Sequence, residues 1–281
     1  TGAVKAAEYG ALASIFRSLS SSTYEDFPHT GGMSYKEGVD SIAHGGLGVL
    51  SAERLSNAIK ENPSLKLTVR LSGKWFPDAL SHNVIGLIRG KKNPEKIITV
   101  GGHLDSWDIG EGAHDDGAGC VHSIGALRLF QKQNITPNNT IRAVMFMNEE
   151  FGLRGGLKYA EIAVKENEQH IAAIESDASG YVPRGFGFSG SDEQHKKIQD
   201  WLKYFDKNTI SYFSKGGGGA DIGPLHRQTG TPMFGLSIDG QKYFEMHHTA
   251  KDVFELVHAR ELELGTASMA SLVYLIDKYG L

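Results

Sequence analysis

KIITVGGHLDSWDIGEGAHDDGAGCVHSIGALRLFQ, residues 96–131, reads as a strand, a polar loop and a helix in succession. Its short run of isoleucine, threonine and valine predicts a buried strand over Lys96–Val100. Ala118 to Gln131 has the apolar spacing of a helix. A strand that leads into a helix is the repeating unit of sheets whose parallel strands are covered by helices.

The same alternation continues on both sides of this stretch, from Asn83 to the end of the chain. Further strands are predicted at Val84–Ile88, Ile141–Met147, Ile171–Ile174 and Met233–Ile238. Further helices are predicted at Gly156–Lys165, Asp192–Phe205 and Arg260–Tyr279. We therefore predict an α/β fold with a largely parallel central sheet. Ligands of such sheets bind at the carboxyl ends of the strands.

Residues 1–82 have a different pattern. The predicted elements there are a helix within Ala6–Leu19, a short helix at Ala52–Lys60 and a half-buried strand at Leu65–Leu71. A stretch rich in serine, proline and glycine separates the first two. We expect residues 1–82 to form a small accessory module, or part of one, and residues 83–281 to form the catalytic domain.

Composition excludes several classes of protein. A net charge of −4 offers no basic field for nucleic acid. No apolar run approaches the roughly 18 residues of a spanning helix. The single cysteine, Cys120, excludes an internal disulfide and a zinc site built from cysteines. The chain begins at Thr1 without a leader, so we expect a processed chain or a fragment, from which a signal peptide could have been removed.

Polar residues of one chemical kind follow the predicted strands. Histidine and carboxylate side chains stand at four strand or loop ends and in one downstream pair: His103 and Asp105, Asp115, Glu149 and Glu150, Asp177, and His247 and His248. We expect these ends to share one rim of the sheet. Zinc binds imidazole nitrogen and carboxylate oxygen, and a zinc pair needs one carboxylate to bridge the two ions. The adjacent Glu149 and Glu150 point in different directions, so one can bind metal while the other accepts a proton.

Each of these signals alone is more often structural. A single His-x-Asp or Glu-Glu pair is usually a surface pair, and Asp-Asp beside glycine is usually a turn. Their conjunction after successive strands favours a metal site. The other histidines lack this context and are interpreted as structural or surface residues: His29, His44, His82, His122, His170, His195, His226 and His258. His114, beside Asp115, is left open.

The ordered motifs resemble the co-catalytic zinc aminopeptidase and glutamate carboxypeptidase family. They are Gly102-His103-Leu104-Asp105, Gly112-Ala113-His114-Asp115-Asp116, Asn148-Glu149-Glu150, Glu175-Ser176-Asp177 and His247-His248-Thr249. Among its members, the chain looks closest to the plasma glutamate carboxypeptidase branch. Ala6–Ser18, Pro28–Gly31 and Trp75–Asp78 look like the later part of that branch's protease-associated insert. The family's catalytic domain starts before this insert, so the chain is expected to lack an amino-terminal helical part.

The resemblance implies a three-layer sandwich, two Zn²⁺ per chain and a role for each residue. His103 and Asp177 would bind one ion, Glu150 and His248 the other, and Asp115 would bridge them. Glu149 would be the general base and Asp105 would orient a ligand. His248 is preferred to His247 as ligand because relatives place an acid four positions later, where Asp252 stands. His247 then takes the position of a residue that stabilises the transition state. Val253 and Ala118 depart from the family pattern, which usually has Thr and often Ser there.

We therefore predict a secreted or periplasmic zinc metallopeptidase that removes terminal residues from small peptides, including dipeptides. Gly216–Asp221 could line a pocket for the α-amine, although a flexible loop is an equal alternative. A homodimer is left open. Two rival interpretations are a one-zinc transferase that resembles glutaminyl cyclase and a non-catalytic relative that keeps only the fold. Neither nucleic acid nor a membrane span is expected.

Overall fold

The computed structural model describes residues 2–74, 76–206 and 209–281, which fall into two compact units. Unit 1 comprises the residues up to Leu80 together with Trp107–Gly110 and Phe244–Lys251. Unit 2 comprises Ser81–Ser106, Glu111–Tyr243 and Asp252–Leu281. We describe each unit by itself. The assignment of residues 1–82 to a protease-associated module stays a prediction, and Trp75 of its Trp75–Asp78 motif lies outside the described residues.

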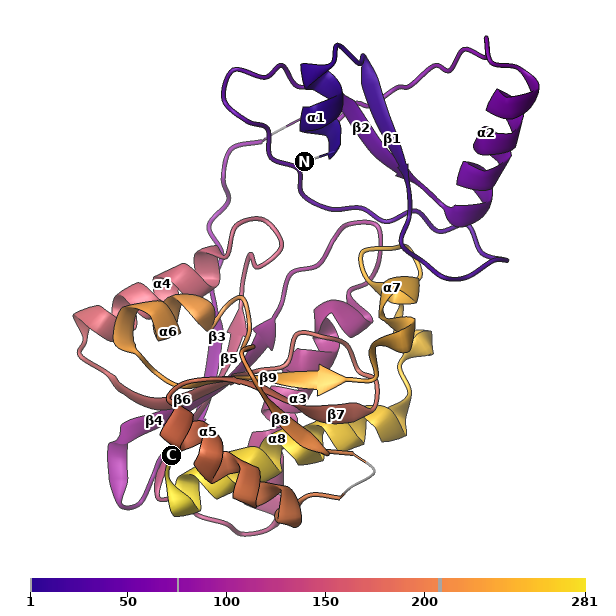
Figure 1. Cartoon of the computed structure of the whole chain (residues 1–281). Helices are drawn as coiled ribbons and strands as arrows, with labels where there is room; N and C mark the ends of the chain where they lie inside the picture. Colours follow the sequence, from indigo (N-terminus) through magenta and orange to yellow (C-terminus); the bar gives the residue numbers. More distant parts are fainter. Residues whose placement is uncertain (1, 75, 207–208) are drawn as a thin grey trace. The chain divides into compact units, whose positions relative to one another are not determined.

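A mixed sheet of seven strands forms the centre of unit 2 (Figure 1). Its order is β3-β5-β4-β6-β9-β7-β8. The bounds are β3 (Val84–Ile88), β4 (Asn93–His103), β5 (Asn139–Phe146), β6 (Gln169–Glu175), β7 (Pro183–Ser189), β8 (Tyr212–Lys215) and β9 (Met233–Ile238). The four middle strands, β5, β4, β6 and β9, are parallel, while β3 and the β7–β8 pair run the other way. The predicted α/β fold is confirmed, and its parallel part is the centre of the sheet.

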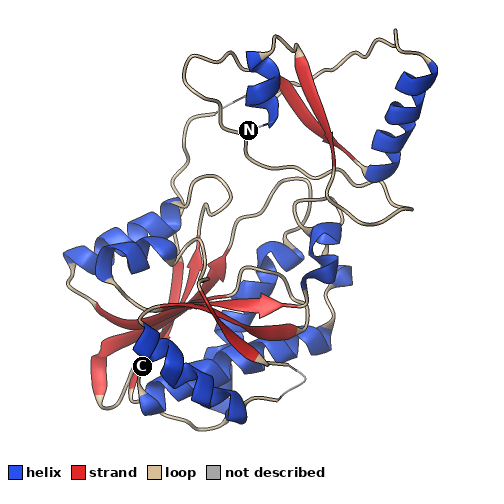
Figure 2. Cartoon of the chain, viewed as in Figure 1, coloured by secondary structure: helices blue, strands red, loops and turns tan. Residues whose placement is uncertain are grey.

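Helices cover both faces of this sheet (Figure 2). On one face lie α3 (Ala118–Lys132) and α8 (Ala259–Tyr279), with α5 (Asp192–Gln199) and a 3₁₀ turn η2 (Asp200–Tyr204) on the same apolar core. On the other face lie α4 (Arg154–Lys165) and α6 (Gly223–Thr229). β5 serves both cores because its side chains alternate: Ile141 and Met145 face the first, and Val144 and Phe146 face the second. The three layers follow directly from this alternation.

Unit 1 contains α1 (Gly2–Glu8), α2 (Val49–Glu61) and a parallel pair of strands, β1 (Ala13–Arg17) and β2 (Ala43–Leu47). The segment Phe244–Lys251, which includes most of α7 (Tyr243–Met246), belongs to the same unit. Glu245 holds it there: its carboxylate accepts hydrogen bonds from the hydroxyls of Ser20 (2.7 Å) and Ser21 (2.6 Å). An ion pair between Lys251 and Glu25 adds a second tie.

Two predictions for this part of the chain are wrong. Within Ala6–Leu19 the helix ends at Glu8, near Gly10 with its φ of +78°, and β1 follows because its residues pair with β2. Leu65–Leu71 is not a strand. It has the alternating pattern, but no described strand pairs with it and Leu67 and Leu71 are more than half exposed. In unit 2, the single helix predicted at Asp192–Phe205 is instead two elements, α5 and η2.

None of the described helices is both long enough and apolar enough to cross a membrane.

Candidate metal centre

The predicted residues of unit 2 gather at one edge of the parallel strands. His103 is the last residue of β4. Glu149 and Glu150 follow β5, and Asp177 follows β6. Since β5, β4 and β6 are neighbouring parallel strands, their carboxyl ends meet at the same edge. The topology therefore explains why residues from separate parts of the sequence come together.

His103 stands at the centre of this group and is 1 % exposed. Its Nε2 lies 3.2 Å from Asp115 Oδ1 and 3.3 Å from Asp177 Oδ1. Its Nδ1 lies 2.8 Å from the backbone oxygen of Asp105, which can only accept, so Nδ1 carries the proton. In the neutral ring Nε2 then holds the lone pair and directs it between two carboxylates. That is the arrangement of an imidazole that binds a metal through Nε2.

Asp105 has a further contact that its spacing does not reveal. Its carboxylate accepts from the backbone amides of Glu149 (2.9 Å) and Glu150 (3.1 Å). The backbone oxygen of Asp105 thus fixes the tautomer of His103. The side chain of Asp105 instead orders the turn that carries both glutamates. One residue positions three candidate site residues.

Asp115 is held in place by the far end of the chain. It lies in η1 (Ala113–Gly117), a single π-helical turn before α3. The Asp252 carboxylate accepts from the amides of His114 (2.6 Å) and Asp115 (3.0 Å). The peptide bond between Asp115 and Asp116 is cis. Asp116 is buried and accepts from the amides of His103 and Gly119, both at 3.0 Å.

These side chains fit zinc. One nitrogen or oxygen atom each from His103, Asp115 and Glu150 lies within 4.8 Å of the others, and the same holds for His103, Asp116 and Asp177. Imidazole with carboxylates is a donor set that zinc accepts. A buried group of carboxylates is costly unless a cation balances it. Of the two adjacent aspartates, Asp116 accepts from backbone amides with both carboxylate oxygens, whereas Asp115 Oδ1 faces Nε2 of His103.

The electrostatics of the edge show the same crowding of negative charge. Burial, with the nearby Asp177, raises the pKa of Glu149 to about 7. Burial also raises the pKa of Asp177.

Tyr243 was not singled out from the sequence. Burial and the carboxylates of Asp115 and Asp177 raise the pKa of its phenol, which therefore stays a hydrogen-bond donor.

His247 and His248 lie in unit 1, so their part in the metal site stays a prediction. Their rings stack with centroids 3.6 Å apart, and Trp107 lies 5.5 Å from the ring of His248. His248 has a φ of +55°, which is uncommon outside glycine and is a form of strain that gathers at functional sites.

The glycine loop, residues 216–219, leads to a buried acid, Asp221. Asp221 is 0 % exposed, and neither of its carboxylate oxygens has a hydrogen bond to a described residue. Burial raises its pKa to about 8. Its neighbour Glu175 accepts from the amide of Ile222 at 2.8 Å. Gly217, Gly218 and Gly219 line a small pocket of about 180 Å³ together with Asp177.

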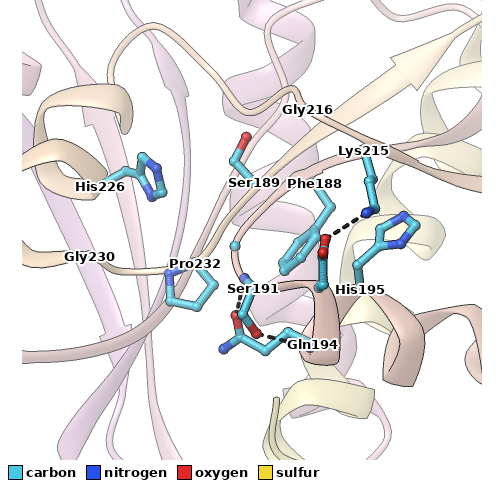
Figure 3. Close-up of a pocket in the computed structure, with 12 residues that line it drawn as sticks. Phe188, Ser189, Ser191, Gln194, His195, Lys215, Gly216, His226, Gly230 and Pro232 are labelled. Carbon is cyan, nitrogen blue, oxygen red and sulfur yellow. Dashed lines mark hydrogen bonds and ion pairs between the residues drawn. The ribbon is translucent and has the colours of Figure 1, made fainter.

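A larger pocket of unit 2, of about 560 Å³, lies away from this edge (Figure 3). It is lined by the end of β7, the start of α5 and the turn before β9, at the opposite ends of the strands. An exposed ion pair between Lys215 and Asp192 (2.6 Å) crosses its rim. Such pairs contribute little energy, and none of the candidate catalytic or metal-binding residues lines this pocket.

Comparisons with known proteins show which family and fold the chain resembles. Residues 83–273 match Peptidase family M28. Carboxypeptidase Q of Bos taurus is 34 % identical over 98 % of this chain, and the chain spans 58 % of that protein. A Peptidase M28 precursor from Shewanella amazonensis SB2B is 31 % identical, with a TM-score of 0.86 over all of this chain and 63 % of that one. A zinc aminopeptidase from Bacillus subtilis shares the fold, with a TM-score of 0.60, 22 % identity and coverage of 96 % of this chain and 65 % of that one.

Proposed function

The chain belongs to Peptidase family M28, and from that premise we propose that it is a zinc-dependent exopeptidase acting on small peptides. The observation that carries the proposal is the edge where His103 Nε2 faces the carboxylates of Asp115 and Asp177. The names of the relatives, carboxypeptidase Q and zinc aminopeptidase, support the choice of an exopeptidase and of zinc.

Two zinc ions per chain would be held by five residues. We assign His103 and Asp177 to one ion, Glu150 and His248 to the other, and Asp115 to both. When bound, such a pair would polarise a peptide carbonyl and lower the pKa of a water molecule, so that the water would lose a proton more readily and become a better nucleophile. The fixed Nδ1 proton of His103 supports its assignment, because it leaves Nε2 for the metal.

Glu149 is the proposed general base. It accepts a proton from the attacking water at its carboxylate and passes it to the leaving amine. The Asp105 carboxylate accepts from the amide of Glu149 and so keeps its backbone in place. His247 is proposed to stabilise the negative charge that develops on the carbonyl oxygen.

Small peptides, including dipeptides, are the proposed substrates, and the proposed location is secreted or periplasmic. A homodimer is a further proposal.

The deciding experiment combines metal analysis of the purified chain with hydrolysis of a dipeptide panel. We expect about two zinc ions per chain. Glu149→Gln should lower kcat by roughly 10²–10⁴-fold while retaining its zinc. Glu193→Gln, an exposed glutamate of α5, is the matched control and should keep full activity.

Three results would count against the proposal. Full activity with fewer than one zinc per chain would remove the metal from the mechanism. Undiminished activity of Glu149→Gln would remove the assigned base. One zinc per chain, with cyclisation of amino-terminal glutamine instead of hydrolysis, would favour the transferase.

A further inference from the structure

His114 is the histidine whose role the sequence leaves open, and the structure buries it between two segments of unit 2. Its side chain lies in η1, directly before Asp115, and is 1 % exposed. The ring stacks on that of Tyr181, with centroids 4.7 Å apart. Tyr181 belongs to the loop between β6 and β7, which also carries Asp177. The ring therefore lies between the segments that hold two of the proposed zinc ligands.

The Nδ1 atom of His114 joins these two segments. It lies 2.6 Å from the hydroxyl oxygen of Ser179, and the backbone amide of Gly180 donates to it at 3.3 Å. An amide N–H can only donate, so Nδ1 is the acceptor and carries no proton. The Ser179 hydroxyl can then donate to the same nitrogen. In the neutral ring the proton is on Nε2, which has no hydrogen bond to a described residue.

The contact to Ser179 holds a strained part of the loop shortly after Asp177. Ser179 has a φ of +110°, a conformation that is unfavourable for residues other than glycine. Its side chain is 4 % exposed, so bulk water does not replace the partner that His114 provides. The ring of His114 therefore helps to fix the backbone that carries Asp177.

On the other side, the backbone of His114 is fixed independently of its ring. The Asp252 carboxylate accepts from the amides of His114 and Asp115. Asp115 Oδ1 and Asp177 Oδ1 lie 3.2 Å and 3.3 Å from the same nitrogen of His103. Two carboxylates so close to one point repel each other, and a tie between their backbones opposes their separation. His114 is such a tie, because its amide belongs to one segment and its ring binds the other.

We propose that His114 is a positioning residue of the metal centre, which sets the spacing of the Asp115 and Asp177 carboxylates through the two hydrogen bonds at its Nδ1. The inference rests on the proposed function, because it takes both aspartates as zinc ligands. All the residues that it uses belong to unit 2.

Two substitutions at position 114 separate the hydrogen-bond acceptor from the bulk of the ring. Asparagine and leucine both branch at Cγ, so His114→Asn can place its Oδ1 where the wild type has Nδ1. His114→Leu has a similar shape and no acceptor, so it leaves the Ser179 hydroxyl and the Gly180 amide without this partner. Ser179→Gly is a milder variant, because it removes one donor and glycine adopts a positive φ without strain.

The matched control is His226→Leu in α6. His226 is half-buried and its Nδ1 lies 2.7 Å from the backbone oxygen of Thr231. It lines the larger pocket, at the opposite ends of the strands from the metal centre. Its replacement removes a histidine hydrogen bond without touching either segment that His114 joins.

The first arm titrates zinc chloride into each chain after removal of metal, with calorimetric detection. We expect His114→Leu to weaken zinc binding by about 10–100-fold. Ser179→Gly should weaken it less, and His114→Asn and His226→Leu should stay close to the wild type. Combining Ser179→Gly with His114→Leu should add no further loss, because the acceptor is already gone. Equal losses in His114→Asn and His114→Leu, or wild-type binding by His114→Leu, would overturn the proposal.

The second arm separates positioning from a purely structural role. Cobalt(II) replaces zinc, and its visible absorption spectrum follows the arrangement of its ligands. We expect the wild-type spectrum in His114→Asn and His226→Leu and an altered one in His114→Leu. A lower Tm of metal-free His114→Leu together with an unchanged cobalt spectrum would show a structural role only and overturn the proposal. If His114→Leu does not fold, wild-type zinc affinity and cobalt spectrum in Ser179→Gly would overturn it.

The wild type distinguishes this inference from the proposed function. A wild-type chain that binds zinc but hydrolyses no dipeptide would overturn the proposed function, while the metal titrations would still decide the role of His114. A wild-type chain that binds no zinc would overturn both.

Discussion

Asp252 illustrates how a single side chain can position a reactive one. Its two oxygens accept from consecutive backbone amides, at His114 and Asp115, while the Asp115 carboxylate faces His103. When a buried acceptor of this kind is replaced, the amides that lose it are left without a partner, and the free energy of unfolding falls by about 1–3 kcal/mol. Asp252 is 3 % exposed, so water cannot easily substitute for it.

We therefore expect Asp252→Ala to lower the free energy of unfolding by about 1–3 kcal/mol and to weaken zinc retention. Urea denaturation and metal analysis after dialysis measure the two effects. Asp192→Ala is the control, because Asp192 makes an exposed ion pair with Lys215 and its loss should change stability by less than about 1 kcal/mol. Equal effects of the two variants would show that the Asp252 hydrogen bonds are unimportant.

For single residues, the sequence predicts which side chains belong to the candidate site but not the hydrogen bonds that position them. The positions of His103, Glu149 and Asp177 after strands follow from periodicity and topology. The amide contacts of Asp105 and Asp252 do not, because they join residues 44 and 138 positions apart, from Asp105 to Glu149 and from Asp252 to His114. Only the folded chain brings such pairs together.

Between elements, α3 and α8 meet around a buried histidine. His122 is 0 % exposed, its Nδ1 lies 2.8 Å from Ser176 Oγ, and a Cβ on Gly265 of α8 would lie 2.2 Å from its Nε2. Burial lowers the pKa of His122 to about 4, since little water is present to solvate a charged ring.

The sign of the resulting pH dependence is fixed. Above pH 6.5 the ring is neutral in both folded and unfolded chains. As pH falls from 6.5 to 4, the unfolded chain binds a proton that the folded chain does not, so the free energy of unfolding falls, by about 3 kcal/mol in total. Urea denaturation at pH 7 and pH 5 in EDTA should show about 2 kcal/mol of this loss. His122→Gln should remove it, and the exposed His82→Gln should not. A slope unchanged in His122→Gln would contradict the assignment.

The strands from β3 to β9 in the sheet order are predictable, and the β7–β8 pair at the other edge is not. β3 and β9 have the predicted bounds, and β4, β5 and β6 lie within a few residues of them. β7 and β8 have no clear signal. Gly185 and Gly187 interrupt the apolar run of β7, yet both are needed there: a Cβ on Gly185 would lie 2.5 Å from the ring of Tyr212 in β8. Because the two strands approach closely, glycine stands where an apolar side chain would otherwise give the sequence pattern of a strand.

For the molecule as a whole, metal binding should couple to folding. A ligand that binds only the native chain stabilises it by about 2.7 kcal/mol at 100 times its Kd. We expect zinc to raise Tm relative to the chain in EDTA, and Asp115→Asn to reduce that rise. The control Asp239→Asn, in a half-exposed ion pair with Arg184, should respond to zinc as the wild type does. An undiminished response of Asp115→Asn would remove Asp115 from the proposed ligands.

The chain passes between the two units five times, after Leu80, Ser106, Gly110, Tyr243 and Lys251. This threading limits how the protein can be recombined. A chimaera that takes only the first 80 residues from a relative would join a foreign β1 and β2 to the native residues 244–251, and so would produce a hybrid unit 1. A faithful exchange requires three grafts, residues 1–80, 107–110 and 244–251, transferred together.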